Sequence, residues 1–249
     1  MDVSEICVLT GLIFAAATIY SSVGHAGASG YLAAMALMGV TPATMKPTAL
    51  VLNILVASLG TYRQYRAELI NWRTLAPLAM ASVPLAFIGG AIQLPGHWYR
   101  ILVGTLLLVA AARLAINTHG PEGLKTEPAA PGSVVIALIV GGTIGILSGL
   151  TGTGGGIFLS PLLIFLGWAD ARQCAALTAP FILVNSISGL AGNIASMKSL
   201  PTEIPYFIVA AMLGALLGTQ AGLRWLTART LQRILAIVVF IAASKFILT

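Results

Sequence analysis

Apolar segments follow one another along nearly the whole chain, with almost no polar sequence between them. Hydrophobic residues make up 58% of the 249 residues and charged residues only 8%, whereas soluble domains carry about 25% charged residues. A hydrocarbon core of about 30 Å is crossed by roughly 20 apolar residues of α-helix. The chain offers many such segments, which predicts an all-α polytopic membrane protein surrounded by the lipid bilayer.

The apolar segments form two sets of five, one on each side of a polar stretch. The first set covers approximately Glu5 to Tyr20, Ser29 to Met38, Pro47 to Tyr62, Leu75 to Ile92 and Trp98 to Ile116; the second covers Ser133 to Leu150, Gly156 to Leu166, Ala175 to Ala195, Ile204 to Trp225 and Leu231 to Leu248. Like residues recur in the same order about 130 residues apart, including Asn53 with Asn185 and Gly60 with Gly192. Because internal duplication is the usual plan of secondary transporters, we predict a first transmembrane repeat (1–116), an inter-repeat linker (117–132) and a second transmembrane repeat (133–249).

Basic residues near segment ends bear on the relative orientation of the repeats. One basic loop follows the third segment of the first repeat and another follows the fourth segment of the second: Arg63, Arg66 and Arg73, then Arg224, Arg229 and Arg233. Both loops should face the cytoplasm, which inverted repeats satisfy if all five segments cross. If the short segments 29–38 and 156–166 re-enter instead, the two loops fall on opposite sides. We predict inverted repeats with eight full transmembrane helices and two short ones.

Each repeat contains one glycine-rich break inside apolar surroundings. In the second repeat it reads Thr151-Gly152-Thr153-Gly154-Gly155-Gly156, and its degraded copy reads Val23-Gly24-His25-Ala26-Gly27-Ala28-Ser29-Gly30. Irregular backbone is tolerated at membrane depth only where it faces protein or a water-filled cavity. A half-helix that begins at a break leaves its first N–H groups without partners and carries a partial positive charge. We interpret the two breaks as the walls of one polar, anion-binding site.

One helix terminus alone is too weak to hold a dehydrated anion. It contributes about 0.3–1 kcal/mol, or up to about 2 when partly buried, whereas removing an ion from water costs several kcal/mol. Two facing termini with additional hydroxyl and amide donors come closer to balance. The predicted substrate-binding residues are therefore Gly24, His25, Gly27, Ser29, Gly30, Thr48, Asn53, Thr151, Gly152, Thr153, Gly154, Gly155, Gly156, Thr178 and Asn185.

Several of these side chains also have purely structural interpretations. Asn53 and Asn185 could hydrogen-bond across helices as packing contacts, and threonines often bond their own helix backbone. His25 could be a solvated histidine beside the break. Lys46 is predicted to anchor its helix at the membrane interface rather than to bind substrate.

Other glycines repeat every four residues and are predicted to lie on one helix face for close packing. They are Gly141, Gly145 and Gly149 in one segment and Gly214, Gly218 and Gly222 in another. The glycine cluster at 152–156 does not match a nucleotide-binding loop, because Ile157-Phe158 follows it in place of Gly-Lys-Ser/Thr.

The sequence offers no pattern for enzymatic or nucleic-acid chemistry. All seven acids lie at segment ends or in loops, and His25, His97 and His119 lie in separate segments. We therefore predict no catalytic residue, no metal site and no cofactor. The 13 Lys and Arg residues are scattered singly, which indicates membrane topology signals and not a nucleic-acid partner. An intramembrane enzyme and a non-transporting scaffold are the minor alternatives.

Two motifs resemble a known family. They are Gly-Leu-Thr-Gly-Thr-Gly-Gly-Gly-Ile-Phe-Leu-Ser-Pro-Leu-Leu at 149–163 and its copy Ser-Ser-Val-Gly-His-Ala-Gly-Ala-Ser-Gly-Tyr-Leu at 21–32. Together with the duplicated layout, they resemble the TauE/SafE family of bacterial sulfite exporters and related permeases. The resemblance covers nearly the whole chain, although the first copy departs by carrying His25, Ala26 and Ala28. It implies a multi-pass transporter of the bacterial inner (plasma) membrane that moves a small anion such as sulfite or a sulfonate.

The position of the acids also bears on the direction of transport. No carboxylate is evident at mid-membrane, so a proton or sodium site built on Asp or Glu is not expected. A negative-inside potential drives an anion outward by about 2.3 kcal/mol per charge per 100 mV. We therefore predict export of a small sulfur-containing anion, sulfite foremost, by alternating access, with any proton carried by the substrate or by His25. The alternative is an uptake permease for an organosulfonate or another small anion. A homo-oligomer is left open.

Overall fold

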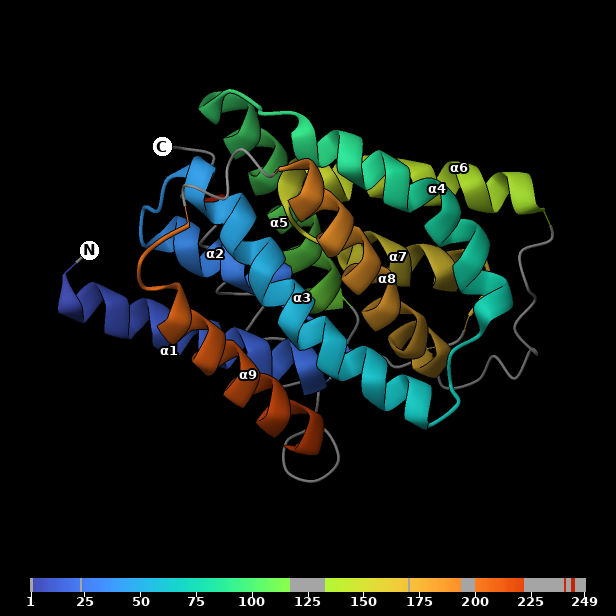
Figure 1. Cartoon of the computed structure of the whole chain (residues 1–249), viewed down its shortest axis with the longest axis horizontal. Coiled ribbons are helices and arrows are strands. Elements are labelled where there is room, and N and C mark those ends of the chain that lie inside the picture. The colour runs from blue at the N-terminus through green and yellow to red at the C-terminus, as the bar shows by residue number, and fades with distance from the viewer. Residues whose placement is uncertain are drawn as a thin grey trace.

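The described part of the chain is entirely helical (Figure 1). The computed structural model describes residues 2–22, 24–116, 133–169, 171–193, 200–221, 240 and 243–244. Within these ranges nine helices follow one another: α1 (Val3–Ser22), α2 (Ala28–Leu37), α3 (Pro42–Arg66), α4 (Trp72–Ala91), α5 (Gly96–Ile116), α6 (Val134–Thr151), α7 (Gly156–Phe165), α8 (Ala171–Gly192) and α9 (Ile204–Ala221). The prediction of an all-α protein is confirmed for these residues, which contain no strand.

Helix length separates candidates for crossing a membrane from shorter helices. Five described helices are long and apolar enough to cross, judged by length and composition: α1, α3, α4, α6 and residues 173–192 of α8. The two short segments predicted after the breaks are helices of ten residues each, α2 and α7. Ten residues span only about 15 Å, half of a hydrocarbon core. The helices thus indicate a multi-pass membrane protein, whereas eight full crossings stay a prediction.

The third segment begins earlier than predicted. Its helix, α3, starts at Pro42, so Pro47 lies inside it and does not mark its start. Proline is tolerated inside membrane helices because neighbouring helices and local adjustments satisfy the carbonyl that loses its partner. The same holds for three further prolines in helix interiors, Pro77, Pro84 and Pro180.

Three predicted features fall outside the described residues. They are the linker 117–132, the last apolar segment Leu231 to Leu248 apart from residues 240 and 243–244, and the basic loop with Arg224, Arg229 and Arg233. The division into two repeats therefore stays a prediction. The packing of the described helices bears on it.

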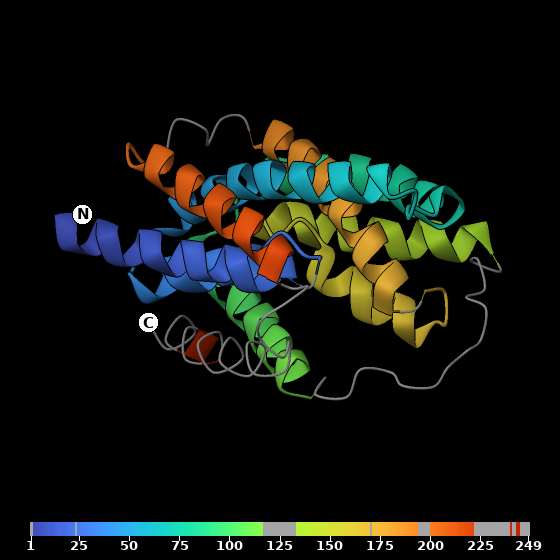
Figure 2. The ribbon, with the colours of Figure 1, turned by 90° about the horizontal axis from the view of Figure 1, so that it is seen from below.

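The helices from the two halves of the chain are interleaved. α1 packs on α9 and α4 packs on α6, so each pair contains one helix from each half (Figures 1 and 2). α3 and α8 pack on each other at the centre and are the most buried of the crossing candidates. They run antiparallel, because Gly60 of α3 faces Ala179 of α8 whereas Gly189 faces Leu50. α1 and α6 likewise run in opposite directions (Figure 1).

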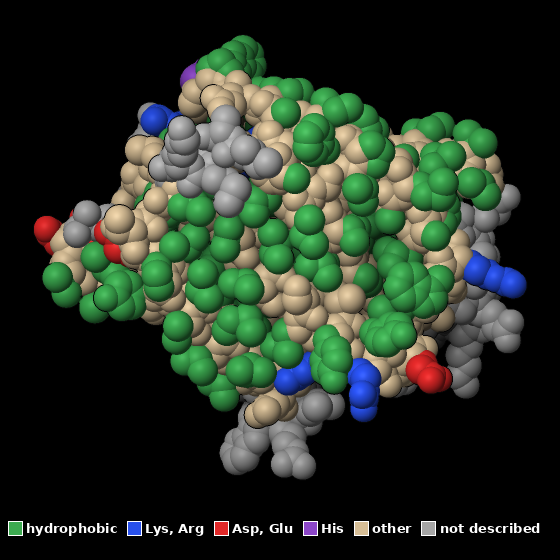
Figure 3. All heavy atoms as spheres, viewed as in Figure 1, with side chains coloured by type: hydrophobic (Ala, Val, Ile, Leu, Met, Phe, Trp, Pro, Cys, Tyr) green, Lys and Arg blue, Asp and Glu red, His purple; other side chains and the backbone are tan. Residues whose placement is uncertain are grey.

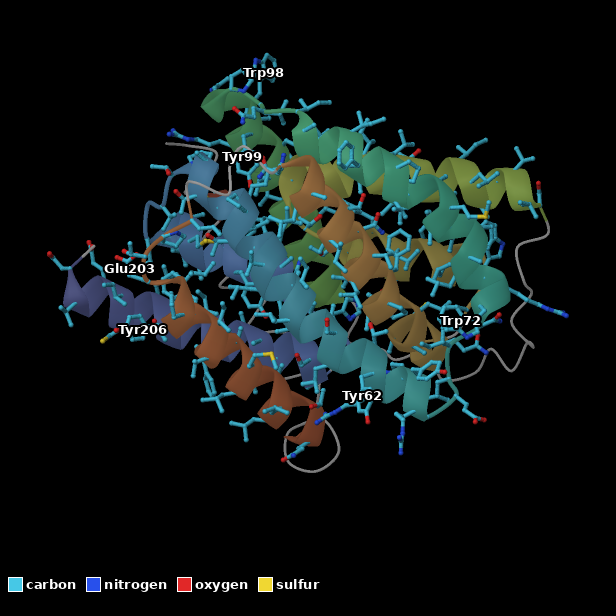
Figure 4. The ribbon with its side chains drawn as sticks, in the orientation of Figure 1. Tyr62, Trp72, Trp98, Tyr99, Glu203 and Tyr206 are labelled. Atoms are coloured by element: carbon cyan, nitrogen blue, oxygen red, sulfur yellow. The ribbon has the colours of Figure 1, made fainter. Side chains whose placement is uncertain are left out.

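The surface has the polarity of a membrane protein. On the face seen in Figure 3, apolar side chains spread over the middle and charged side chains lie at the margins. Tyr62 and Trp72 are exposed toward the end of α3, and Trp98 and Tyr206 are exposed toward the opposite end of the molecule (Figure 4). Because tryptophan and tyrosine concentrate at both membrane interfaces, these two groups mark the two sides of the membrane along α3.

Glycines at four-residue spacing let α4 and α6 approach backbone to backbone. A β-carbon at any of three glycines of α6 would strike a backbone carbonyl oxygen of α4: Gly141 at Leu78, Gly145 at Ser82 and Gly149 at Ala86. Such close approach is how membrane helices associate without a hydrophobic driving force between them. The packing interpretation of this stripe is confirmed.

The second glycine stripe lies in α9 and faces α1. β-Carbons at Gly214 and Gly218 would meet the backbone carbonyls of Phe14 and Thr18, respectively. Gly222, the third member of the stripe, falls outside the described residues. The two helix pairs that join the halves, α4 with α6 and α1 with α9, thus both pack closely through glycines spaced four residues apart.

Replacing Gly145 with valine should destabilise the protein. The branched side chain would press on the Ser82 carbonyl, and overpacking of this kind costs about 1–3 kcal/mol. We expect Gly145→Val to lower the thermal midpoint of the purified protein in detergent. Gly11→Val is the matched control, because nothing lies within 4 Å of a β-carbon at Gly11. Equal midpoints for the two variants would contradict the proposed importance of the α4–α6 contact.

Candidate functional site

Both glycine-rich breaks lie where one helix ends and the next begins. The first break separates α1 from α2, and the second separates α6 from α7. Gly24 and Gly27 in the first break have φ of 82° and 100°, and Gly152, Gly154 and Gly155 in the second have φ of 80°, 72° and 82°. Side chains of L-residues rarely allow these values. Residues 151–156 are all buried, so this irregular backbone faces protein, as lipid surroundings require.

Polar side chains of α3 and α8 enclose Gly154. A β-carbon at Gly154 would lie 3.0 Å from Nδ2 of Asn53 and 2.8 Å from Oγ of Ser186. Both residues have 0% exposure. Among the described residues, neither polar atom of the Asn53 side chain nor the Ser186 hydroxyl has a hydrogen-bond partner. Leaving a buried polar group unsatisfied costs about 1–3 kcal/mol, so stability does not account for this pair.

Ser148 adds a third hydroxyl to this region. It lies on the last turns of α6, is fully buried and likewise has no partner in the described part of the chain. A β-carbon at Gly155 would lie 3.5 Å from the Ser148 β-carbon. We call Asn53, Ser148 and Ser186, together with the backbone of 154–156, the central cluster. Sequence reasoning missed both serines; the available signal was that Ser148 lies one helical turn before the break and that Ser186 adjoins Asn185.

Asn185, which pairs with Asn53 in the repeat alignment, is fully hydrogen-bonded instead. Its Oδ1 accepts from Ser82 Oγ at 2.5 Å, and its Nδ2 donates to the Phe181 carbonyl at 2.8 Å. The packing interpretation thus describes the contacts of Asn185, whereas the unpartnered side chain of Asn53 does not fit it. The two asparagines are not used in the same way.

His25 joins the first break to the other half of the chain. Its Nε2 lies 2.9 Å from Ser160 Oγ on α7, and Ser160 Oγ lies 2.9 Å from Thr178 Oγ1 on α8. Thr178 also donates to the Cys174 carbonyl at 2.6 Å. His25 is therefore an ordered, hydrogen-bonded residue between the halves. Ser160 was not predicted, because its role depends on a contact across 135 residues of sequence.

The remaining predicted site residues have local contacts. Thr48 donates to Thr44 O at 2.7 Å, and Thr151 donates to Leu147 O at 2.7 Å and lies 3.0 Å from Thr153 Oγ1. The Ser29 and Tyr20 hydroxyls are hydrogen-bonded to each other. Close packing surrounds three of the predicted glycines: Gly27 meets Tyr31, Gly30 meets Ala16, and Gly156 meets Ile182. The structure thus brings Asn53 and Thr178 to the second break and links Thr178 through Ser160 to His25 in the first break, but keeps the hydroxyls of Thr48 and Ser29 in local bonds.

Comparisons with known proteins identify the family of the chain. A family model described as "Sulfite exporter TauE/SafE" matches residues 9–246. The chain belongs to the TauE/SafE family. "Probable membrane transporter protein y4hK" of Sinorhizobium fredii is 39% identical over 235 residues, which cover 94% of this chain and 95% of the relative. "Probable membrane transporter protein YjnA" of Bacillus subtilis is 24% identical over 259 residues, covering 96% and 98%. No solved structure matches.

Family membership confirms the resemblance that the two glycine motifs carry. This TauE/SafE protein is a multi-pass membrane transporter. The relatives' names state transport and not enzymatic activity. Among the described residues, no group of three or more His, Cys, Asp or Glu side chains is placed to hold a metal ion.

Two cavities of the TauE/SafE protein lie at different ends of α3. The first vestibule, of about 490 Å³, is lined by Gly24, His25, Arg63, Gln64 and neighbouring residues. The second vestibule, of about 260 Å³, is lined by Thr41, Lys46, Gln93, Tyr99, Asn193 and neighbouring residues. Asn53 lies between these two stretches of α3, so the central cluster separates the vestibules along this helix.

Lys46, predicted to be an interface anchor, is buried inside the protein and is bonded to the end of another helix. Its exposure is 6%, and its Nζ donates to the carbonyls of Gly89, Gly90 and Ile92 at 3.3, 2.9 and 3.2 Å. These carbonyls lie at the C-terminal end of α4, where the last turn lacks helical N–H partners. Lysine near a helix C-terminus satisfies such carbonyls and complements the helix dipole.

Replacement by leucine should lower the stability of the protein at Asn185 but not at Asn53. Asn53→Leu removes an unpartnered polar group of similar size, so the thermal midpoint should not fall. Asn185→Leu leaves Ser82 Oγ unpartnered and should lower the free energy of unfolding by about 1–3 kcal/mol. Thermal unfolding of both variants in the same detergent measures the difference. A fall for Asn53→Leu as large as that for Asn185→Leu would contradict our assignment of the central cluster.

Proposed function

We propose that this TauE/SafE transporter exports a small sulfur-containing anion, with sulfite as the foremost candidate, across the bacterial inner membrane by alternating access. The observation that carries the proposal is the central cluster, where Asn53 and Ser186 are fully buried beside the second break without partners among the described residues. The family description names sulfite export. The substrate-binding residues that we propose are those predicted from the sequence, with Ser148 and Ser186 added.

The chemistry of the central cluster favours an anion over a cation. It contains an amide, two hydroxyls and the first turn of α7, whose N–H groups carry a partial positive charge. No Asp or Glu is buried in the described part of the chain. Hydroxyl and amide groups donate to oxyanions, whereas a cation site in a membrane would be expected to contain carboxylates.

Neutral donors also suit transport, because a transporter has to release what it binds. A helix terminus contributes up to about 2 kcal/mol when partly buried, and a hydrogen bond to a charged group about 1.5–3 kcal/mol. Two or three such contacts offset a dehydration cost of several kcal/mol without exceeding it greatly. The proposed site should therefore bind its anion weakly enough to release it.

The interleaved helices support inverted repeats. In the repeat alignment α1 corresponds to α6 and α4 to α9, so the pairs α1–α9 and α4–α6 exchange when the repeats are exchanged. The corresponding helices α3 and α8 run antiparallel through the centre. A two-fold axis between them, lying in the membrane plane, is the arrangement of inverted-topology transporters.

Export driven by the membrane potential needs no buried carboxylate to bind a coupling ion, and no buried acid is found among the described residues. A small anion leaves a negative-inside cell without a coupled ion, because the potential provides about 2.3 kcal/mol per charge per 100 mV. Uptake of an organosulfonate, the alternative, requires a coupling ion for which the described helices offer no buried carboxylate.

Flux into proteoliposomes tests substrate and driving force together. We expect radioactive sulfite to enter faster when the interior is made positive, with accumulation rising by up to about 50-fold per 100 mV for a monovalent anion. Asn53→Ala should abolish this flux, and chloride should not substitute. A rate of sulfite uptake that does not change with the membrane potential would overturn the electrogenic mechanism. Movement of methanesulfonate but not sulfite would favour the alternative substrate.

The membrane sidedness of two loops tests the inverted arrangement. Glu68 follows α3 and Glu203 precedes α9, at corresponding places in the two predicted repeats. Figure 4 places Glu203 at the opposite end of the molecule from Trp72, which begins α4. In a protein lacking Cys7 and Cys174, cysteines at positions 68 and 203 should be labelled by an impermeant maleimide from opposite sides. Labelling from the same side would show parallel repeats.

A further inference from the structure

The second vestibule has features that the central cluster does not explain. Lys46 lines it, is 6% exposed and has only carbonyl oxygens as hydrogen-bond partners among the described residues. These carbonyls give the ammonium the partial negative charge of a helix C-terminus, about half an elementary charge, which offsets its charge only in part. No Asp or Glu is among the described residues that line this vestibule. An uncompensated charge away from water is costly, so the vestibule attracts a counter-anion.

A second residue independently indicates a ligand in the same place. Asn193 follows α8, is 3% exposed and lines the second vestibule. Its Nδ2 has no hydrogen-bond partner within the described ranges. An amide nitrogen is a donor only, so its partner has to be an acceptor such as an oxyanion oxygen.

The size and position of the second vestibule suit a small oxyanion on its way through the protein. At roughly 30 Å³ per water in the liquid, about 260 Å³ corresponds to roughly nine waters, enough for a partly hydrated oxyanion. A β-carbon at Gly152 would lie 3.0 Å from the Lys46 carbonyl and 3.2 Å from its Cγ, so Lys46 packs on the second break. Along α3, Lys46 and Asn53 are separated by about 10 Å at 1.5 Å per residue.

We propose that the second vestibule is an anion-binding site of its own, in which Lys46 and Asn193 hold the substrate oxyanion on one side of the central cluster. Lys46 attracts the anion by its charge, and the Asn193 amide donates to one of its oxygens. On the other side, Arg63 lines the first vestibule. The proposal rests on the proposed function, because it assumes that a small oxyanion crosses the protein.

Side-specific kinetics of sulfite transport test this site. In proteoliposomes with one orientation, Lys46→Met should raise the half-saturating sulfite concentration about tenfold when sulfite is offered from the side that carries Thr41. When sulfite is offered from the opposite side, the half-saturating concentration should stay unchanged. Lys46→Arg keeps the charge, so its half-saturating concentration should be close to that of the unmodified protein. Arg63→Met is the matched control, and should raise the half-saturating concentration only from the other side.

A structural role of Lys46 predicts a different result. Lys46→Met also removes three bonds to the end of α4, which would lower the thermal midpoint and affect transport equally from both sides. Asn193→Leu leaves those bonds in place and should still raise the half-saturating concentration from the Thr41 side alone. Unchanged or side-independent values for both variants would overturn the second site. Absence of sulfite flux in the unmodified protein would instead refute the proposed function.

Discussion

Backbone that leaves the helical conformation inside a membrane has to be enclosed by protein, and the rest of this structure depends on meeting that requirement twice. The second break is enclosed by Asn53 of α3 and Ile182 of α8, and the first break is packed against Ala175 of α8. Each break is therefore covered at least partly by the other half of the chain. The glycine stripes that join α1 to α9 and α4 to α6 hold these halves together from the outside.

The two halves of the chain differ in their hydrogen bonding where the proposed chemistry lies. Asn53 and Asn185 occupy matching places in antiparallel helices, yet Asn185 is bonded to Ser82 and Phe181 while Asn53 has no partner among the described residues. The first break forms a hydrogen-bonded contact through His25, whereas beside the second break the Ser148 and Ser186 hydroxyls have no partner in the described part of the chain. On the proposed function, the bonded side chains of His25 and Asn185 support the site, and Asn53, Ser148 and Ser186 provide the donors for the substrate. Each of the two predicted repeats thus contributes both a support and a donor.

The sequence was sufficient for features that depend on local pattern. Hydropathy and glycine clustering located both breaks and the ten-residue helices after them, because a break needs glycine and a membrane helix needs apolar residues. Features that depend on tertiary contact were missed. Pro47 looked like a helix start although α3 begins at Pro42, and Lys46 looked like an anchor because the carbonyls at the end of α4 are remote in sequence. Ser148, Ser160 and Ser186 gained importance only through what the fold places beside them.

The distribution of charge along α3 explains how a site can attract an anion without trapping it. Arg63 and Lys46 line the two vestibules, and the central cluster between them has neutral donors. A lysine or arginine at the central cluster would bind an oxyanion too tightly to release it, because Coulomb attraction grows steeply where the effective dielectric constant is low. On the proposed function, charge near both ends and neutral donors in the middle would draw the anion in from either side and hold it weakly at the central cluster. On that proposal, the direction of net movement is set by the membrane potential and not by the protein.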